Sequence, residues 1–369
     1  MPCTARRLPP RKIYERVGLR NEFERPAVVD RTGQARVIAG LNMNALTATK
    51  VLAPTDGGKF SDPDRTLSGQ TRAQVALNRL DTLWINTGSL CNITCVNCYI
   101  ESSPSNDRLA YLSAEEVRAF LLEAKSAGTR EIGFTGGEPF LNAQLGTMLE
   151  DALGMGFQVL VLTNAMQPML RPNVKKQLLA LNARYRDLLS MRVSLDHYTE
   201  ELHEAERGKR TWAKTLEGLD WLVANNFRVA IAGRTCWGET EAKARAGYKA
   251  LYESRGWPFD ADDAEITVLF PEMDGSHDVP EITVACWSIL GKSPDSMMCA
   301  SSRMIVKRKG AELPSVVPCT LLPYEPAFEM GSTLADAARA DSGMFDHGAI
   351  KLCHPHCAKF CVLGGGSCS

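Results

Sequence analysis

Two neighbouring stretches decide the fold: Thr82-Leu-Trp-Ile-Asn86 and, four residues later, Cys91-Asn-Ile-Thr-Cys95-Val-Asn-Cys98-Tyr99. The first is short, apolar and β-prone, as expected of a buried strand. Three thiols within eight residues can converge on one centre if their loop curls around it. A cubane iron–sulfur cluster needs a ligand on each of its four irons, so three local cysteines would leave one iron open for a small molecule. The sequence therefore predicts a strand that leads into a cluster-binding loop.

Two alternatives to a cluster stay open for these cysteines. A zinc site would usually need a fourth Cys or His nearby, and none lies within the loop. Three unrelated thiols are the second alternative, in a chain of 369 residues with twelve cysteines. We favour the iron–sulfur cluster over both.

Beyond this loop, β-prone runs alternate with segments that carry helical patterns. Ser113 and Glu116 form a capping-box pattern at the start of one such helix. The further runs lie at 131–134, 157–162, 191–195, 227–232 and 265–270, and the other helical segments lie around 143–153, 173–187, 212–225 and 239–254. Six strands that alternate with helices predict parallel βα units, either in a doubly wound sheet or in a full or partial barrel.

A glycine-rich or polar motif follows each of the next three strands. The motifs are Gly136-Gly137-Glu138-Pro139, Leu162-Thr163-Asn164 and Val193-Ser194-Leu195-Asp196. Taken singly, they could be a tight turn with a solvated carboxylate and two helix caps. However, the carboxyl ends of parallel strands form one face, and ligands bind there. Because all of these motifs and the cysteine loop would meet at that face, we predict a shared site.

The cysteine spacing resembles that of radical S-adenosylmethionine (radical SAM) enzymes, and the motif at Gly136 resembles their GGEP motif. The resemblance covers about residues 80–270 and implies an α/β fold with a partial (βα)6 TIM-like barrel. It also implies a [4Fe–4S] cluster on the three cysteines, with S-adenosylmethionine as cofactor. The positions that it implies for cofactor contact are Tyr99, Gly136, Gly137, Glu138, Asn164, Ser194, Asp196 and Arg207. Asn97 departs from the family, since many members have an aromatic residue just before the third cysteine.

The resemblance implies reductive cleavage of S-adenosylmethionine to a 5′-deoxyadenosyl radical, which takes a hydrogen atom from a small-molecule or peptide substrate. An electron donor such as flavodoxin or ferredoxin would supply the electron. No segment identifies the substrate or the catalytic residue that acts on it. At Gly137 we expect glycine because the backbone must approach the bound cofactor closely. The alternative function is a non-enzymatic iron–sulfur or zinc protein, acting as an electron carrier or scaffold, which would have no need of the GGEP motif.

The C-terminal region carries seven of the twelve cysteines. A hairpin is expected at 304–307 and 315–317, with its turn near Gly310, and Cys299 and Cys319 flank it. This layout is similar to the Twitch and SPASM extensions of radical SAM enzymes, which implies an auxiliary iron–sulfur cluster. The expected ligands are Cys299, Cys319, Cys357 and Cys361, with Cys286, Cys353 and Cys368 as alternates. A structural zinc site or buried free thiols are the alternatives.

We expect three regions: an irregular N-terminal extension (1–78), the barrel (79–272) and a small cysteine-rich domain (273–369). The net charge of −1, from 42 basic and 43 acidic residues, gives no general attraction to nucleic acid or to an anionic membrane. No apolar run is long enough to span a bilayer, and the N-terminus lacks a secretory apolar core. We therefore expect a cytoplasmic protein, in which clustered thiols bind metal more often than they form disulfides.

Overall fold

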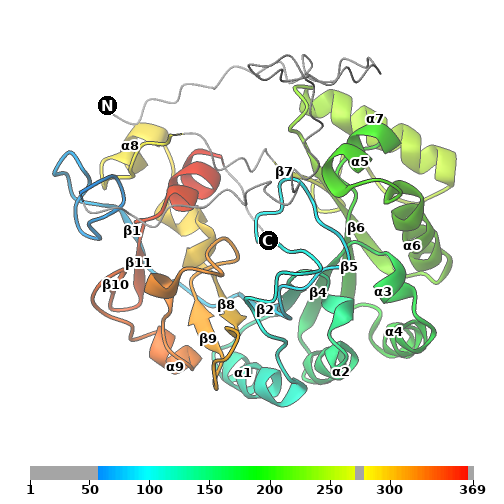
Figure 1. Cartoon of the computed structure of the whole chain (residues 1–369), viewed down its shortest axis with the longest axis horizontal. Helices are drawn as coiled ribbons and strands as arrows, with labels where there is room; N and C mark the ends of the chain where they lie inside the picture. The colour runs from blue at the N-terminus through cyan, green and yellow to red at the C-terminus, as the bar shows by residue number, and fades with distance from the viewer. Residues whose placement is uncertain (1–56, 271–277, 365–369) are drawn as a thin grey trace, which may run out of the picture.

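The computed structural model describes residues 57–270 and 278–364 (Figure 1). The expectations for 1–56, and the alternate ligand Cys368, lie outside the described residues. The main element is an eight-stranded sheet in the order β7-β6-β5-β4-β3-β2-β8-β9. Its strands are β2 (Thr82–Asn86), β3 (Glu131–Thr135), β4 (Gln158–Thr163), β5 (Leu189–Ser194), β6 (Arg228–Arg234), β7 (Thr267–Phe270), β8 (Ser302–Val306) and β9 (Ser315–Val317).

The six strands β2 to β7 are parallel, and each pairs with the next along the chain. They coincide within a few residues with the six predicted strands, which confirms the parallel α/β fold. Helices cover the convex side of the curved sheet, as in part of a barrel (Figure 1). These helices are α1 (Ala114–Ser126), α2 (Leu145–Gly154), α4 (Pro172–Tyr185), α6 (Trp212–Ala224) and α7 (Glu241–Arg255).

The central strand β2 is buried on both faces, which explains why it reads as an unbroken apolar run. Leu83 and Ile85 belong to the large core between sheet and helices. Trp84 points to the opposite, concave side, where it packs with Leu160 and Met304. Gly133 on β3 provides room for the indole, because a Cβ there would lie 2.3 Å from the Trp84 ring. The concave side near β2 is therefore filled by side chains, as in a packed barrel interior.

The predicted hairpin of the C-terminal region is confirmed by β8 and β9, which pair antiparallel. Its position was not predicted. β8 lies beside β2 and runs parallel to it, with Leu83 opposite Arg303, so the sheet continues past the first strand of the barrel. The predicted boundary near 272 remains a prediction, but no break in the sheet separates the two regions.

Residues just before the barrel pack against the C-terminal region. β1 (Gln74–Val75) forms a second sheet with β11 (Ala349–Lys351) and β10 (Phe345–Asp346), in the order β1-β11-β10. Arg72 and Glu281 form a buried ion pair at 2.6 Å, and Arg72 also donates to the Leu352 carbonyl. The segment from about 57 to 78 is thus joined to residues more than 200 positions later.

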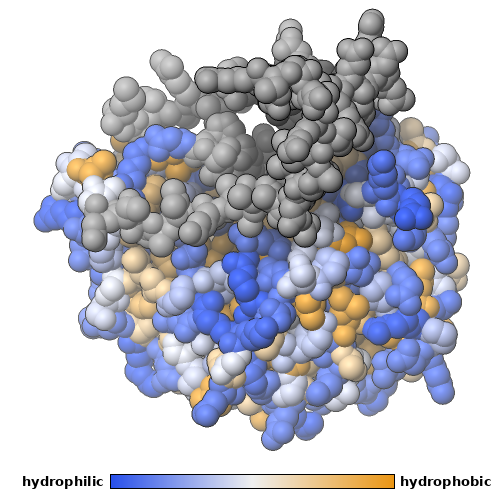
Figure 2. All heavy atoms as spheres, viewed as in Figure 1, coloured by the Kyte–Doolittle hydropathy of each residue, from blue (hydrophilic) through white to orange (hydrophobic). Residues whose placement is uncertain are grey.

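None of the helices in the described ranges is long and apolar enough to cross a bilayer. Polar and apolar residues are intermixed on the visible face (Figure 2).

Candidate active site

The three cysteines that follow β2 lie in one pocket at the carboxyl ends of the parallel strands. Cys91, Cys95 and Cys98 line it together with residues from the loops after β3, β4 and β5. Of the residues expected to contact the cofactor, the pocket is lined by Tyr99, Gly136, Gly137, Asn164, Ser194 and Arg207, whereas Glu138 and Asp196 are buried behind it. The structure thus brings together the motifs that the sequence analysis placed on one face.

Burial shapes the chemistry of the cysteine loop. It raises the pKa of the Cys91 thiol to about 12 and that of Cys95 to about 11. These thiols ionise only with a strong compensating charge, such as that of a bound metal centre. The loop returns on itself, because the Ser102 N–H donates to Cys98 Sγ at 3.3 Å and the Cys91 N–H donates to the Ser103 carbonyl at 3.1 Å. This curled loop presents its thiols to one side, as a cluster requires.

The two glycines after β3 are needed because two backbone segments approach closely. The Gly137 N–H donates to the Gly88 carbonyl at 2.8 Å. A Cβ on Gly137 would lie 2.1 Å from the Leu90 oxygen, and a Cβ on Gly136 would lie 2.6 Å from the Gly88 oxygen. The φ of Gly136 is 140°, a value that side chains rarely allow. We expected glycine here for the approach of a cofactor, but the atoms next to it belong to the segment that leads into Cys91.

Glu138 joins the loop after β3 to the loop after β4. Its carboxylate is 1% exposed, which excludes the solvated alternative. It accepts hydrogen bonds from the Thr163 hydroxyl and the Asn164 N–H, both at 2.9 Å, and from the Phe140 N–H at 3.2 Å. Burial raises the pKa of this carboxyl to about 7, although the hydrogen bonds act in the opposite direction. Glu138 therefore positions Asn164 rather than lining the pocket.

Asn164 connects the β4 loop to the cysteine loop. Its side-chain amide donates to the Asn92 side-chain oxygen at 2.9 Å, and its nitrogen lies 3.9 Å from Cys91 Sγ. Its side-chain oxygen accepts from the Met166 N–H at 3.1 Å. This is a local side-chain turn rather than a helix cap, since α3 (Gln167–Leu170) has no side-chain cap.

A buried charge network lies beside the thiols. Asp196 pairs with Arg207 at 2.7 Å and with Arg234 at 3.5 Å, and Arg234 also reaches Glu206 at 3.5 Å. Two carboxylates thus face two guanidiniums, which is how buried charges are tolerated. Thr199, not Asp196, stands at the N-cap of α5 (Glu200–Arg207). The alternative of Asp196 as a helix cap is therefore wrong.

Sequence reasoning missed two members of this network. Arg234 lines the pocket at the end of β6, and its position at a strand end was the available indication. Glu206 accepts both the N–H and the side-chain amide of Asn97, each at 2.9 Å. Glu206 thereby holds the residue between the second and third cysteines. Nothing in the local sequence links these two positions.

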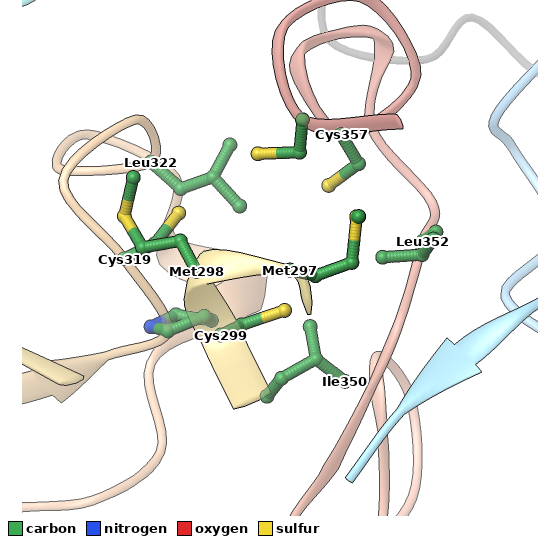
Figure 3. A pocket seen from close by; sticks show the side chains of 10 residues that line it. Met297, Met298, Cys299, Cys319, Leu322, Ile350, Leu352 and Cys357 are labelled. Atoms are coloured by element: carbon green, nitrogen blue, oxygen red, sulfur yellow. The ribbon is translucent and has the colours of Figure 1, made fainter. Parts of the chain in front are cut away.

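A second pocket holds cysteines of the C-terminal region (Figure 3). All four preferred ligands line it: Cys299, Cys319, Cys357 and Cys361. Cys299 lies on η4 (Met298–Ala300) before β8, and Cys319 follows β9. Cys357 and Cys361 lie on η6 (Cys357–Leu363), and Cys357 lies across the pocket from Cys299 and Cys319 (Figure 3). The remaining lining is apolar and includes Met297, Leu322 and Ile350.

The two alternate ligands within the described residues, Cys286 and Cys353, do not line this pocket. The Cys353 thiol donates to the backbone carbonyls of Phe60 and Asp62, at 3.2 and 3.4 Å. Cys286 lies at the start of α8 (Cys286–Leu290), and it too is absent from the lining. Burial raises the pKa of Cys299 to about 11 and that of Cys357 well above its usual range. As at the first pocket, a compensating cation would be needed to make these thiols ligands.

Residues 85–242 match the family model of the radical SAM superfamily. The chain carries a radical SAM domain. The matched segment contains the three cysteines and all of the strand-end motifs that line the first pocket. Members of this superfamily are enzymes whose cofactors are a [4Fe–4S] cluster and S-adenosylmethionine. The domain assignment therefore agrees with the resemblance carried by the motifs.

Two curated relatives match part of the chain. The antilisterial bacteriocin subtilosin biosynthesis protein AlbA of Bacillus subtilis (strain 168) is 28% identical over 143 residues, which are 38% of this chain and 30% of AlbA. The AdoMet-dependent heme synthase of Methanosarcina barkeri (strain Fusaro / DSM 804) is 27% identical over 142 residues, 38% of each chain. The chain therefore covers well under half of the length of either relative.

The fold of the radical SAM domain has a known counterpart. Native anSMEcpe with bound AdoMet aligns with a TM-score of 0.50 and 15% identity, over 70% of this chain and 80% of the other. At this level of identity the similarity concerns the fold alone. It supports the partial barrel inferred from the parallel strands.

Proposed function

We propose that this chain is an enzyme that binds S-adenosylmethionine in the first pocket, with a [4Fe–4S] cluster on Cys91, Cys95 and Cys98. When bound, these cofactors supply a 5′-deoxyadenosyl radical that takes a hydrogen atom from the substrate. The observation that carries the proposal is the lining of the pocket: three thiols and the ends of four parallel strands converge there. An electron carrier or scaffold would not need the polar cavity beside its thiols.

The residues around the pocket divide into two groups in this proposal. Tyr99, Ser194, Asn164 and Arg207 line the pocket and contact the cofactor, together with the backbone of the two glycines. Glu138 and Asp196 are positioning residues, because Glu138 bonds the Asn164 backbone and Asp196 pairs with Arg207. This refines the sequence prediction, in which both carboxylates were expected to contact the cofactor.

The second pocket is proposed to hold an auxiliary iron–sulfur cluster on Cys299, Cys319, Cys357 and Cys361. Four thiols from three separate segments line one small, apolar cavity, and this is the ligand number that a cubane requires. A four-thiol zinc site would use the same residues. Metal analysis separates the two, since only the cluster contains iron and acid-labile sulfide.

The substrate class is proposed by analogy with one relative. AlbA is named for the biosynthesis of the bacteriocin subtilosin, and we propose a peptide substrate for this chain as well. A one-electron donor of the flavodoxin or ferredoxin class would supply the electron. We place the protein in the cytoplasm, because its many clustered thiols stay reduced there.

The deciding experiment is anaerobic reconstitution with iron, sulfide, S-adenosylmethionine and dithionite, followed by measurement of 5′-deoxyadenosine. We expect the parent to form it and the triple variant Cys91→Ala/Cys95→Ala/Cys98→Ala to form none. The triple variant should keep the iron and sulfide of the second pocket. Cys236→Ala is the matched control: this thiol lines neither pocket, so its variant should resemble the parent. Equal 5′-deoxyadenosine from parent and triple variant would refute the assignment, and a parent that forms none would favour the non-enzymatic alternative.

A further inference from the structure

A buried arginine lies next to the cysteines of the second pocket. Arg303 is the second residue of β8 and is only 1% exposed. Its guanidinium donates to the carbonyls of Cys299 at 2.6 Å, Ser302 at 2.7 Å and Gly348 at 3.2 Å. The Cys299 carbonyl belongs to one of the proposed ligands, so Arg303 holds the backbone of that ligand from behind the residues that line the pocket.

The charge of Arg303 is not matched by a carboxylate. Among residues 57–270 and 278–364, no Asp or Glu lies within ion-pair distance of its guanidinium. The other deeply buried arginines differ: Arg72 pairs with Glu281, and Arg207 pairs with Asp196. Backbone carbonyls satisfy hydrogen bonds but bring no net charge, and an uncompensated buried charge is costly. The site therefore calls for an anion.

The nearby groups that can supply negative charge are thiolates. Cys299 and Cys319 are the groups whose negative charge would act on the guanidinium of Arg303. Cys319 reaches the same place because it follows β9, the antiparallel partner of β8. Cation and thiols are thus placed together by the hairpin.

We propose that Arg303 is the built-in counter-charge of the metal centre held by these cysteines, and that it favours the reduced form of that centre. The inference rests on the auxiliary cluster proposed above. Four thiolates make such a centre anionic, and reduction by one electron from the flavodoxin- or ferredoxin-class donor adds one more negative charge. The guanidinium stays protonated throughout, and no bond is made or broken. Net charge and hydrogen bonding are among the factors that set the reduction potential of such clusters, with cluster type and solvent exposure.

The test uses the full chain with Cys91, Cys95 and Cys98 replaced by Ala, so that only the second pocket can hold iron. Arg303→Gln removes the charge and keeps hydrogen-bond donors, whereas Arg303→Lys keeps the charge in a different shape. Arg245→Gln is the matched control, because it removes the same charge far from the second pocket. Arg245 lies on α7 and donates to the Ala261 and Thr267 carbonyls, next to β7 at the other edge of the sheet. The readout is a redox titration followed by electron paramagnetic resonance.

We expect Arg303→Gln to lower the equilibrium constant for reduction at least tenfold, which is a shift of about 59 mV for a one-electron couple. Arg303→Lys and Arg245→Gln should stay close to the parent. Loss of iron from Arg303→Gln but not from Arg303→Lys would also support the proposal, because the variant that keeps the positive charge would then be the one that keeps the metal. An intact cluster with an unchanged potential in Arg303→Gln would overturn it, as would equal loss of iron from both. A background that holds zinc or no metal would instead refute the auxiliary cluster, and the role of Arg303 with it.

Discussion

Replacing Glu138 by Gln tests how the buried carboxylate at the centre of the site affects the free energy of unfolding. The substitution keeps the shape of the side chain and removes its charge. The amide nitrogen cannot accept a hydrogen bond, so one of the donors from Thr163, Asn164 or Phe140 loses its acceptor. That loss costs roughly 1–3 kcal/mol and does not depend on pH.

The charge contributes a second effect, which does depend on pH. Burial raises the pKa of Glu138 to about 7 from its ordinary value of 4.5. Between these two pH values the native chain binds more protons than the unfolded chain, so the stability falls as the pH rises. A rise of about 2.5 pKa units corresponds to roughly 3 kcal/mol, which is lost in full above pH 7. Below pH 4.5 this loss is absent.

The assay is urea unfolding of the reduced, metal-free parent and Glu138→Gln variant between pH 5 and 8, followed by circular dichroism. The unfolding free energy of the parent minus that of the variant should fall by as much as roughly 1.4 kcal/mol per pH unit up to pH 7, then level off. Glu150→Gln removes an exposed carboxylate on α2 that pairs with Arg184, and it reports any effect of net charge alone. If the difference in unfolding free energy between parent and variant does not change with pH, the inferred effect of the buried charge is refuted, whatever the size of that difference.

Three further substitutions test the residues around the two pockets. Gly137→Ala should reduce both the iron content of the first pocket and cofactor binding, because the new Cβ would clash with the Leu90 carbonyl just before Cys91. Iron analysis after reconstitution checks this. A full iron content with weakened cofactor binding would contradict the prediction. Cys357→Ser should remove iron from the second pocket. Cys353→Ser should keep the iron, because the Cys353 thiol donates hydrogen bonds to backbone carbonyls instead of lining the pocket. Equal iron contents in the two variants would be incompatible with the proposed ligand set.

Most of the barrel could be predicted because its determinants are local. The strands are short apolar runs between turns, and the helix at α1 begins with a capping box that the structure contains: Ser113 accepts the Glu116 N–H while the Glu116 carboxylate accepts the Ser113 N–H. The place of β8 could not be predicted. Its apolar residues favour a strand, but nothing near them specifies a partner more than 200 positions earlier. Hydrophobic patterning fixes the face of a strand and not its neighbour.

The candidate site shows the same limit at the level of side chains. Strand ends indicate which residues reach the pocket's face, and this was enough to find Asn164 and Ser194, whereas Arg207, at the end of α5, was expected only from the resemblance to radical SAM enzymes. They do not indicate whether a side chain points into the cavity or back into the loops. Glu138 and Asp196 point back into the loops. There the Glu138 carboxylate accepts a hydrogen bond from the Asn164 N–H, and the Asp196 carboxylate pairs with the Arg207 guanidinium. That choice depends on groups supplied by other loops.

Asn97 shows how a departure from the family pattern can have a physical reason within one chain. Its backbone N–H and side-chain amide both bond Glu206, and its carbonyl accepts from Arg234 at 3.1 Å. Glu206 is only 4% exposed, so its carboxylate needs these donors. An aromatic side chain at position 97 would leave it with fewer partners inside a balanced charge network. The loop between Cys95 and Cys98 is therefore held by the polar bonds that Asn97 makes with Glu206 and Arg234.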